Sequence, residues 1–257
     1  MLHATWHSET GTPVVFLHGL LGSQQDWQAV LDRLQNFPEI RPLTIDLPLH
    51  GASEHIACHG FTHARELIHQ TILHYIGNQP FYLIGYSLGG RLALDYTLNS
   101  HNPHLKHTIL EGANIGLATD TERQARWQTD HQWAERFRHE PMTTVLNDWY
   151  QQAVFANLDL HQRSNLIQKR QNNHGIAIAT MLEATSLAKQ TYYQPLLIEK
   201  NWNITFLIGE KDQKFRKMVC DNKLSHHIIP NAGHNAHNEN PQGFIQCLIK
   251  LIEKEKD

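Results

Sequence analysis

The sequence predicts an α/β fold in which helices flank a mostly parallel sheet, with a helical cap inserted between two strands. Short apolar runs alternate with amphipathic helical patterns, which is typical of parallel strands joined by helices. One long stretch in the middle of the chain, from about residue 112 to 193, lacks any convincing strand signal, which indicates an inserted helical segment. A Gly-x-Ser-x-Gly turn also joins one apolar run directly to a helical pattern.

The predicted sheet has six strands with two clear helical patterns between and after them. Apolar residues recur at helical spacing from Phe61 to Tyr75. Near the end of the chain, Asn240 can cap a helix in which Pro241 takes the first position. The strands are expected at residues 14–17, 43–46, 81–86, 108–110, 204–208 and 227–229.

The stretch without strand signals is rich in Gln, Asn, Arg and Trp and carries several helical patterns. Thr119 and Glu122 have the spacing of a capping box and can begin its first helix. We therefore expect an interrupted core of residues 1–112 and 198–257, with a helical cap inserted at residues 113–197.

Composition excludes several classes of protein. The chain has 257 residues, of which 40% are hydrophobic, so it can bury a sizeable core and is not disordered. Its net charge of −3 gives no reason to expect nucleic acid as a partner. We expect a monomer or a weak homo-oligomer.

The location of the protein is predicted from its cysteines and apolar runs. Three cysteines, widely spaced and without a CxxC pair, indicate a reducing compartment. The first residues lack the features of a signal peptide, and the longest apolar run, at 81–94, is broken by Gly, Ser and Arg. We expect a cytoplasmic protein without membrane insertion.

Twenty histidines are unusually many for a chain of this length and raise the possibility of a metal site. His226, His227, His234 and His237 are the candidate ligands, but their spacing fits no standard zinc site. We therefore expect no metal site. Most histidines are interpreted as surface groups that titrate near their ordinary pKa of about 6.5.

A nucleophile turn is predicted at Gly85-Tyr86-Ser87-Leu88-Gly89. Such a turn is too tight for larger residues two positions before and after the serine, and glycines occupy both places. A strand precedes it and a helix follows, as the nucleophile elbow of the α/β-hydrolase fold requires. The turn would expose the Ser87 hydroxyl and direct the Leu88 amide at developing negative charge.

The base and acid that would activate Ser87 are expected on loops after the last strands, in the order serine, acid, histidine. Asp212 follows the strand at 204–208, with Glu210 as a rival acid. His234 follows the last strand. The second oxyanion donor is expected at the Leu20 amide, with Leu21 as the alternative.

Three further residues near strand ends have different expected roles. His18 and Asp46 are interpreted as structural groups that brace their loops. Arg91 lies four residues after Ser87, one helical turn on and on the same side of the helix. A cation beside the nucleophile suits a carboxylate better than a neutral ester, so we expect a small anionic substrate.

Four stretches give the chain a resemblance to a known family. They are 85–91, 147–155, 181–187 and 232–241, which read GYSLGGR, NDWYQQAVF, MLEATSL and AGHNAHNENP. Together they resemble the 2-succinyl-6-hydroxy-2,4-cyclohexadiene-1-carboxylate synthases of menaquinone biosynthesis. The resemblance covers nearly the whole chain, and its cap segments are more specific than the elbow.

The resemblance implies a lyase of the α/β-hydrolase fold that uses no metal and no organic cofactor. It implies elimination of pyruvate from 2-succinyl-5-enolpyruvyl-6-hydroxy-3-cyclohexene-1-carboxylate by triad-assisted proton abstraction, without acylation of Ser87. The substrate is a polycarboxylate, which accounts for cations around the pocket. Motif positions imply these substrate-binding residues: Tyr86, Arg91, Arg126, Trp149 and Arg170.

One position departs from the family pattern, and two other functions stay open. Leu49 stands where relatives usually have glycine, so a positive φ there would be strained.

A carboxylesterase or carbon–carbon bond hydrolase of the same fold is the first alternative function, because one fold hosts many chemistries. A non-catalytic binding protein on this scaffold is the second.

Overall fold

The computed structural model describes residues 1–254 and confirms the predicted α/β architecture. The strands of its sheet have the order β1-β3-β2-β4-β5-β6-β7. Only the pairing of β1 with β3 is antiparallel. The strands are β1 (Ala4–Trp6), β2 (Thr12–Leu17), β3 (Ile40–Ile45), β4 (Phe81–Tyr86), β5 (Leu105–Glu111), β6 (Ile204–Gly209) and β7 (His226–Ile229).

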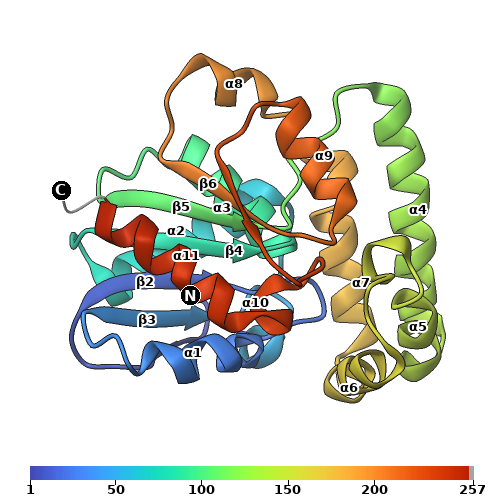
Figure 1. The fold of residues 1–257 in the computed structure, drawn as a ribbon. Coiled ribbons are helices and arrows are strands. Elements are labelled where there is room, and N and C mark those ends of the chain that lie inside the picture. The colour runs from blue at the N-terminus through green and yellow to red at the C-terminus, as the bar shows by residue number, and fades with distance from the viewer. Residues whose placement is uncertain (255–257) are drawn as a thin grey trace.

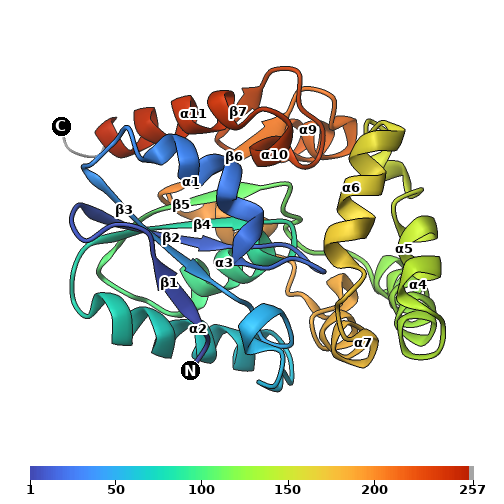
Figure 2. The same cartoon turned by 90° about the horizontal axis from the view of Figure 1, so that it is seen from below.

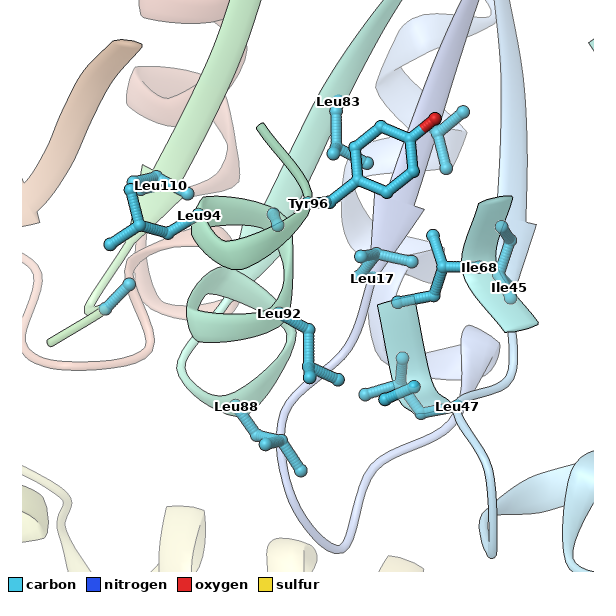
Figure 3. Close-up of a cluster of buried hydrophobic side chains, with 14 of the residues drawn as sticks. Leu17, Ile45, Leu47, Ile68, Leu83, Leu88, Leu92, Leu94, Tyr96 and Leu110 are labelled. Carbon is cyan, nitrogen blue, oxygen red and sulfur yellow. The ribbon is translucent and has the colours of Figure 1, made fainter. Parts of the chain in front are cut away.

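Helices cover both faces of the sheet. On one face lie α1 (Gln28–Leu34), α10 (Ala236–Glu239) and α11 (Pro241–Lys254), and on the other lie α2 (Phe61–Ile76) and α3 (Leu88–Asn99) (Figure 2). Each face therefore has its own apolar core. Figure 3 shows part of the apolar core on the α2 and α3 face, where Leu88 and Leu92 of α3 and Ile68 of α2 approach Leu17 and Leu47.

Between β5 and β6 the chain forms the expected helical insertion, most of which lies beside the core at the end of the strands (Figure 1). The capping box of Thr119 and Glu122 is present at its first helix. The insertion has a separate apolar cluster that includes Phe137, Leu146 and Leu182. Its helices are α4 (Asp120–His139), α5 (Met142–Trp149), α6 (Leu160–Arg170), α7 (Gly175–Ala184) and α8 (Gln194–Glu199).

The remaining helices are α9 (Gln213–Asp221), which follows β6, and short 3-10 helices at Gln24–Trp27, Gly51–Ser53, Ala153–Phe155 and Leu187–Lys189. None of the helices in residues 1–254 is long and apolar enough to cross a bilayer.

The register of the parallel strands places their carboxyl ends along one edge of the sheet. Leu17 of β2 pairs with Gly85 of β4, Tyr86 of β4 pairs with Glu111 of β5, and Gly209 of β6 pairs with Ile229 of β7. Loops that leave these ends meet at the edge facing the insertion, where ligands of open α/β sheets commonly bind (Figure 1).

Leu49, the position where glycine was expected, has a φ of 63°. This left-handed conformation costs about 1–2 kcal/mol for a residue with a Cβ. The Leu49 side chain packs against the core on the α2 and α3 face, and that contact offsets part of the strain.

Candidate active site

The turn after β4 holds Ser87 in a strained conformation at the start of α3. Its φ is 51°, in the left-handed region that residues with a Cβ rarely adopt. A Cβ at Gly85 would overlap the backbone of Gly89, and one at Gly89 would overlap the carbonyl groups of Leu17 and His18. The turn is therefore possible only with glycine at both places.

Asp212 and His234 form a buried hydrogen-bonded pair. His234 Nδ1–H donates to Asp212 Oδ2 at 2.8 Å, and each residue is 6% exposed. Asp212 Oδ1 accepts a hydrogen bond from the Phe215 amide at 3.2 Å, because Asp212 also caps α9. The carboxylate thus has its own anchor and fixes the tautomer that leaves His234 Nε2 free to accept a proton.

Ser87 and His234 line the same cavity, which has a volume of about 320 Å³. Within the described residues no hydrogen bond joins the Ser87 hydroxyl to His234. Such contacts are commonly long before a substrate binds and shorten in the reacting complex.

Two neighbours restrict the position of the His234 ring. Gly112, just after β5, has a φ of 54°, and a Cβ there would lie 2.6 Å from His234 Cε1. The Tyr86 ring packs against His234 at a centroid distance of 5.4 Å and against His237 at 4.8 Å. Burial, followed by the charge of Glu111, raises the pKa of the Tyr86 hydroxyl, so it stays protonated at neutral pH.

Of the backbone amides predicted as oxyanion donors, those of Leu20 and Leu88 donate to no other described residue. Both residues line the cavity with Ser87. The Leu21 amide, considered as the alternative to Leu20, instead donates to His50 Nε2 at 3.1 Å. Its hydrogen is therefore already used.

Two buried histidines brace the loops around these amides. His18 Nδ1–H donates to the Gly19 carbonyl at 2.8 Å, and His18 Nε2 accepts from the Leu47 amide at 3.0 Å. His50 uses both ring nitrogens in the same way. Burial lowers the pKa of His18, and burial together with nearby His18 lowers that of His50 to about 3. Both rings are thus neutral structural groups at physiological pH.

Asp46 has the structural surroundings that were expected for it. Its buried carboxylate accepts hydrogen bonds from the Gln24 and Ala52 amides at 2.7 and 3.0 Å. It lies outside the catalytic cavity.

Arg91, the cation predicted beside Ser87, lies on α3 and lines the cavity. Its guanidinium donates to the Thr185 carbonyl at 2.7 Å and forms no ion pair within residues 1–254. Burial and the neighbouring charge of Arg126 lower the pKa of Arg91 to about 9, so it remains protonated at neutral pH. Arg126 also lines the cavity but is paired with Asp130 at 2.8 Å.

Of the other residues implied by the resemblance, only Trp149 lines the cavity, where its ring meets that of Trp133 at 5.1 Å. Tyr86 lies behind His234, as described above. Arg170 is buried and donates to Asp26 Oδ2 at 2.6 Å. Tyr86 and Arg170 are thus close to the site but are not among the described residues that line the cavity.

The structure does not bring the four candidate metal-binding histidines together. His234 is hydrogen-bonded to Asp212. His237 Nδ1–H instead donates to Glu111 at 2.7 Å, and His237 and Glu111 are each 1% exposed. His226 Nδ1 instead bonds a backbone carbonyl. A different set of residues, on the surface of the cap, does have ligand atoms close to one another: His131, Glu135 and Glu183. Arg138 already pairs with both glutamates.

The interpretation of the histidines as mainly a surface property is incomplete. His18, His50, His234 and His237 are buried around the site, and their contacts hold its loops. The sequence reasoning also missed Lys214, which lines the cavity two residues after Asp212. Its signal was its place in the predicted acid loop, but the helix that carries it, α9, was not predicted.

Comparisons with known proteins agree with this architecture. The family described as alpha/beta hydrolase fold matches residues 12–241. A 2-succinyl-6-hydroxy-2,4-cyclohexadiene-1-carboxylate synthase of Yersinia pestis is 45% identical over 96% of this chain and 90% of its own length. The synthase of Yersinia enterocolitica is 44% identical over 95% and 88%.

Solved structures show the same relationship. MenH from S. aureus matches with a TM-score of 0.89 and 25% identity over the whole of both chains. A thermophilic esterase from Thermogutta terrifontis matches with a TM-score of 0.81 over 99% of this chain and 93% of its own, at 19% identity, which shows the shared fold alone. The chain belongs to the alpha/beta hydrolase fold family and, within it, to the 2-succinyl-6-hydroxy-2,4-cyclohexadiene-1-carboxylate synthases.

Proposed function

We propose that this protein eliminates pyruvate from 2-succinyl-5-enolpyruvyl-6-hydroxy-3-cyclohexene-1-carboxylate in menaquinone biosynthesis, with Ser87, Asp212 and His234 as its catalytic triad. The observation that carries the proposal is that His234, held by the buried Asp212 at 2.8 Å, lines one cavity with Ser87 and with Arg91, which forms no ion pair within residues 1–254. This site combines a base with a cation, as the elimination of an anionic group requires.

The triad would act as a base and not as an acylating nucleophile. His234 Nε2 takes the Ser87 proton while Ser87 Oγ removes a proton from the ring beside the succinyl carbonyl. Enolate charge that develops on that carbonyl oxygen is stabilised by the Leu20 and Leu88 amides. The electrons then form a double bond between ring carbons 2 and 3, the existing double bond moves from carbons 3 and 4 to carbons 4 and 5, and the bond between carbon 5 and the enolpyruvyl oxygen breaks. Protonation of the released enolate gives pyruvate.

Binding of the polycarboxylate is assigned to the residues around this base. Arg91 is the first carboxylate ligand in this proposal, because its guanidinium has spare donors and no anionic partner among the described residues. Arg126 contributes a second cation, and Trp149 supplies an apolar wall for the ring. Tyr86 and Arg170 are proposed to support the pocket from behind and to contact substrate if the cap closes further.

The wider predictions for the protein stay part of the proposal. We place the hydrolase core at residues 1–112 and 198–257 and the cap at 113–197, although α8 crosses the second boundary. We propose a cytoplasmic enzyme that acts without a metal or an organic cofactor. Its partner would be the small anionic substrate, with no nucleic acid and no membrane insertion, and it would act as a monomer or weak homo-oligomer.

The test compares two reactions of the purified protein. Pyruvate release from the enolpyruvyl substrate is followed with a lactate dehydrogenase coupled assay, and the diene product is followed by its absorbance. Hydrolysis of p-nitrophenyl esters is measured in parallel. We expect rapid release of pyruvate and weak ester turnover. Efficient ester hydrolysis without any diene product would show that the protein is a carboxylesterase.

A further inference from the structure

Lys214 is a third cation in the catalytic cavity, and the roles assigned so far do not use it. It lies in the first turn of α9, two residues after Asp212. It lines the cavity together with Ser87, Arg91 and Arg126. The start of α9 is fixed by the Asp212 side chain, which accepts the Phe215 amide, so the same residue that orients His234 also places Lys214.

The Lys214 ammonium has no anionic partner in residues 1–254. Its Nζ atom lies 5.5 Å from the centroid of the Phe215 ring. Lys217, on the same helix, instead pairs with Asp221 at 2.8 Å. Desolvation by neighbouring residues and the positive charge of Arg126 lower the pKa of Lys214 more than the carboxylates of Asp212 and Asp130 raise it, although the residue is exposed to solvent. An anion bound in the cavity would offset both effects.

Arg91, Arg126 and Lys214 differ in whether a carboxylate or carbonyl group already pairs with their charge, and in how exposed their side chains are. Arg126 has Asp130 as its carboxylate partner. Arg91 is held against the Thr185 carbonyl and is more buried than Lys214. Lys214 is thus the most exposed of the three cations that line the cavity and the one without a fixed partner among the described residues.

We propose that Lys214 binds the carboxylate of the enolpyruvyl group and stabilises this group as it leaves. The proposal rests on the function proposed above. When the carbon–oxygen bond breaks, the enolpyruvyl oxygen takes the bonding electrons, and the fragment carries a second negative charge beside its carboxylate. A flexible ammonium on the most exposed of the three cations can follow this fragment toward solvent, whereas the ring and its remaining carboxylates stay with the two less exposed arginines.

An interaction that grows as the bond breaks has a kinetic signature. It lowers the barrier of the chemical step and so contributes to kcat as well as to KM. A cation that only attracted the whole substrate would contribute to KM alone.

The test uses K214M, with K217M as the matched control on the same helix and K214R as the charge-retaining variant. For each, kcat and KM for pyruvate release are measured, with inhibition constants for pyruvate and for the diene product. We expect K214M to lower kcat/KM by about 10- to 100-fold, with a loss in kcat, and to weaken inhibition by pyruvate by about tenfold. Inhibition by the diene product should stay within about threefold of wild type, K214R should retain most activity, and K217M should match wild type.

Three outcomes would overturn the proposal. Unchanged kinetics in K214M would show that Lys214 does not act on the substrate. Weaker inhibition by the diene product, with unchanged inhibition by pyruvate, would assign Lys214 to a carboxylate that stays on the ring. A wild-type enzyme that releases no pyruvate would overturn the proposed function itself, which separates the two failures.

Discussion

Replacing Asp212 by asparagine removes a negative charge from the site and changes the side-chain volume little. In the present structure, Asp212 Oδ2 accepts the Nδ1 hydrogen of His234 at 2.8 Å in surroundings that are almost closed to solvent. The amide nitrogen of an asparagine in this place would offer a hydrogen instead of a lone pair. His234 would then carry its hydrogen on Nε2, where it can no longer take the proton of Ser87.

The expected size of the effect follows from two losses. A hydrogen bond to a charged group contributes about 1.5–3 kcal/mol, and the wrong tautomer removes the base itself. In serine hydrolases the equivalent change lowers kcat by about 10⁴, so we expect a loss of about 10³–10⁴ in kcat for D212N. The KM should change less than about threefold, because Asp212 is not among the cavity-lining residues.

The matched control is E210Q, at the carboxylate that rivals Asp212 in the sequence. Glu210 accepts the Asn231 amide at 2.9 Å and makes no described contact with His234, so E210Q should keep wild-type kcat. The variants are compared in the pyruvate-release assay after their circular dichroism and melting temperatures are matched. A D212N enzyme within tenfold of wild type, or an E210Q enzyme with an equal loss, would refute the assignment of the acid.

Three further changes test the surroundings of the site. G112A places a methyl group 2.6 Å from the His234 ring, and its displacement should lower kcat by about 10²; wild-type activity would refute the close contact. R170M leaves the Asp26 carboxylate buried and unpaired, which should lower the free energy of unfolding, measured by urea denaturation, by about 3–5 kcal/mol. The double variant R170M/D26N should recover most of this loss of stability. If the losses of the two single variants simply add in the double variant, the pairing of Arg170 with Asp26 is contradicted. The pKa of His50 is lowered to about 3 in the folded protein, so as the pH falls below about 6.5 the unfolded chain binds a proton at this histidine and the folded protein does not. Between pH 7 and 5 this difference should lower the free energy of unfolding by about 2 kcal/mol, and H50Q should flatten that part of the pH–stability profile. An identical pH dependence of stability in H50Q would refute the role of His50.

The sheet could be predicted from the sequence because its parallel strands are buried on both faces and read as continuous apolar runs. All six predicted strands are present, within a few residues at their ends. The missed strand, β1, has three residues and pairs antiparallel at the edge of the sheet. Such a short edge strand has no periodicity to detect, and only its pairing with β3 defines it.

The positions of the elbow, the acid and the histidine along the chain could also be predicted, because their loops follow strands with clear signals. Which side chains line the cavity could not, since that depends on how the cap packs against the core. Arg126 reaches the cavity, whereas Arg170, 44 positions later, is held by Asp26 behind it. No local pattern separates these two arginines.

The histidines illustrate the same limit. Composition shows their number, and spacing shows that they do not form a standard zinc site. It does not show that His18 and His50 hold adjacent loops with both ring nitrogens, because those bonds join residues 29 positions apart. Only the tertiary structure distinguishes such buried braces from histidines on the surface.

The central claim is that Ser87 acts as the base in the elimination of pyruvate. The most direct test is pyruvate release by S87A in a single turnover, with binding of the diene product measured on the same preparation. We predict that release falls by at least about 10²–10⁴ while the product still binds within about threefold of wild type. An S87A enzyme that releases pyruvate at the wild-type rate would contradict the account.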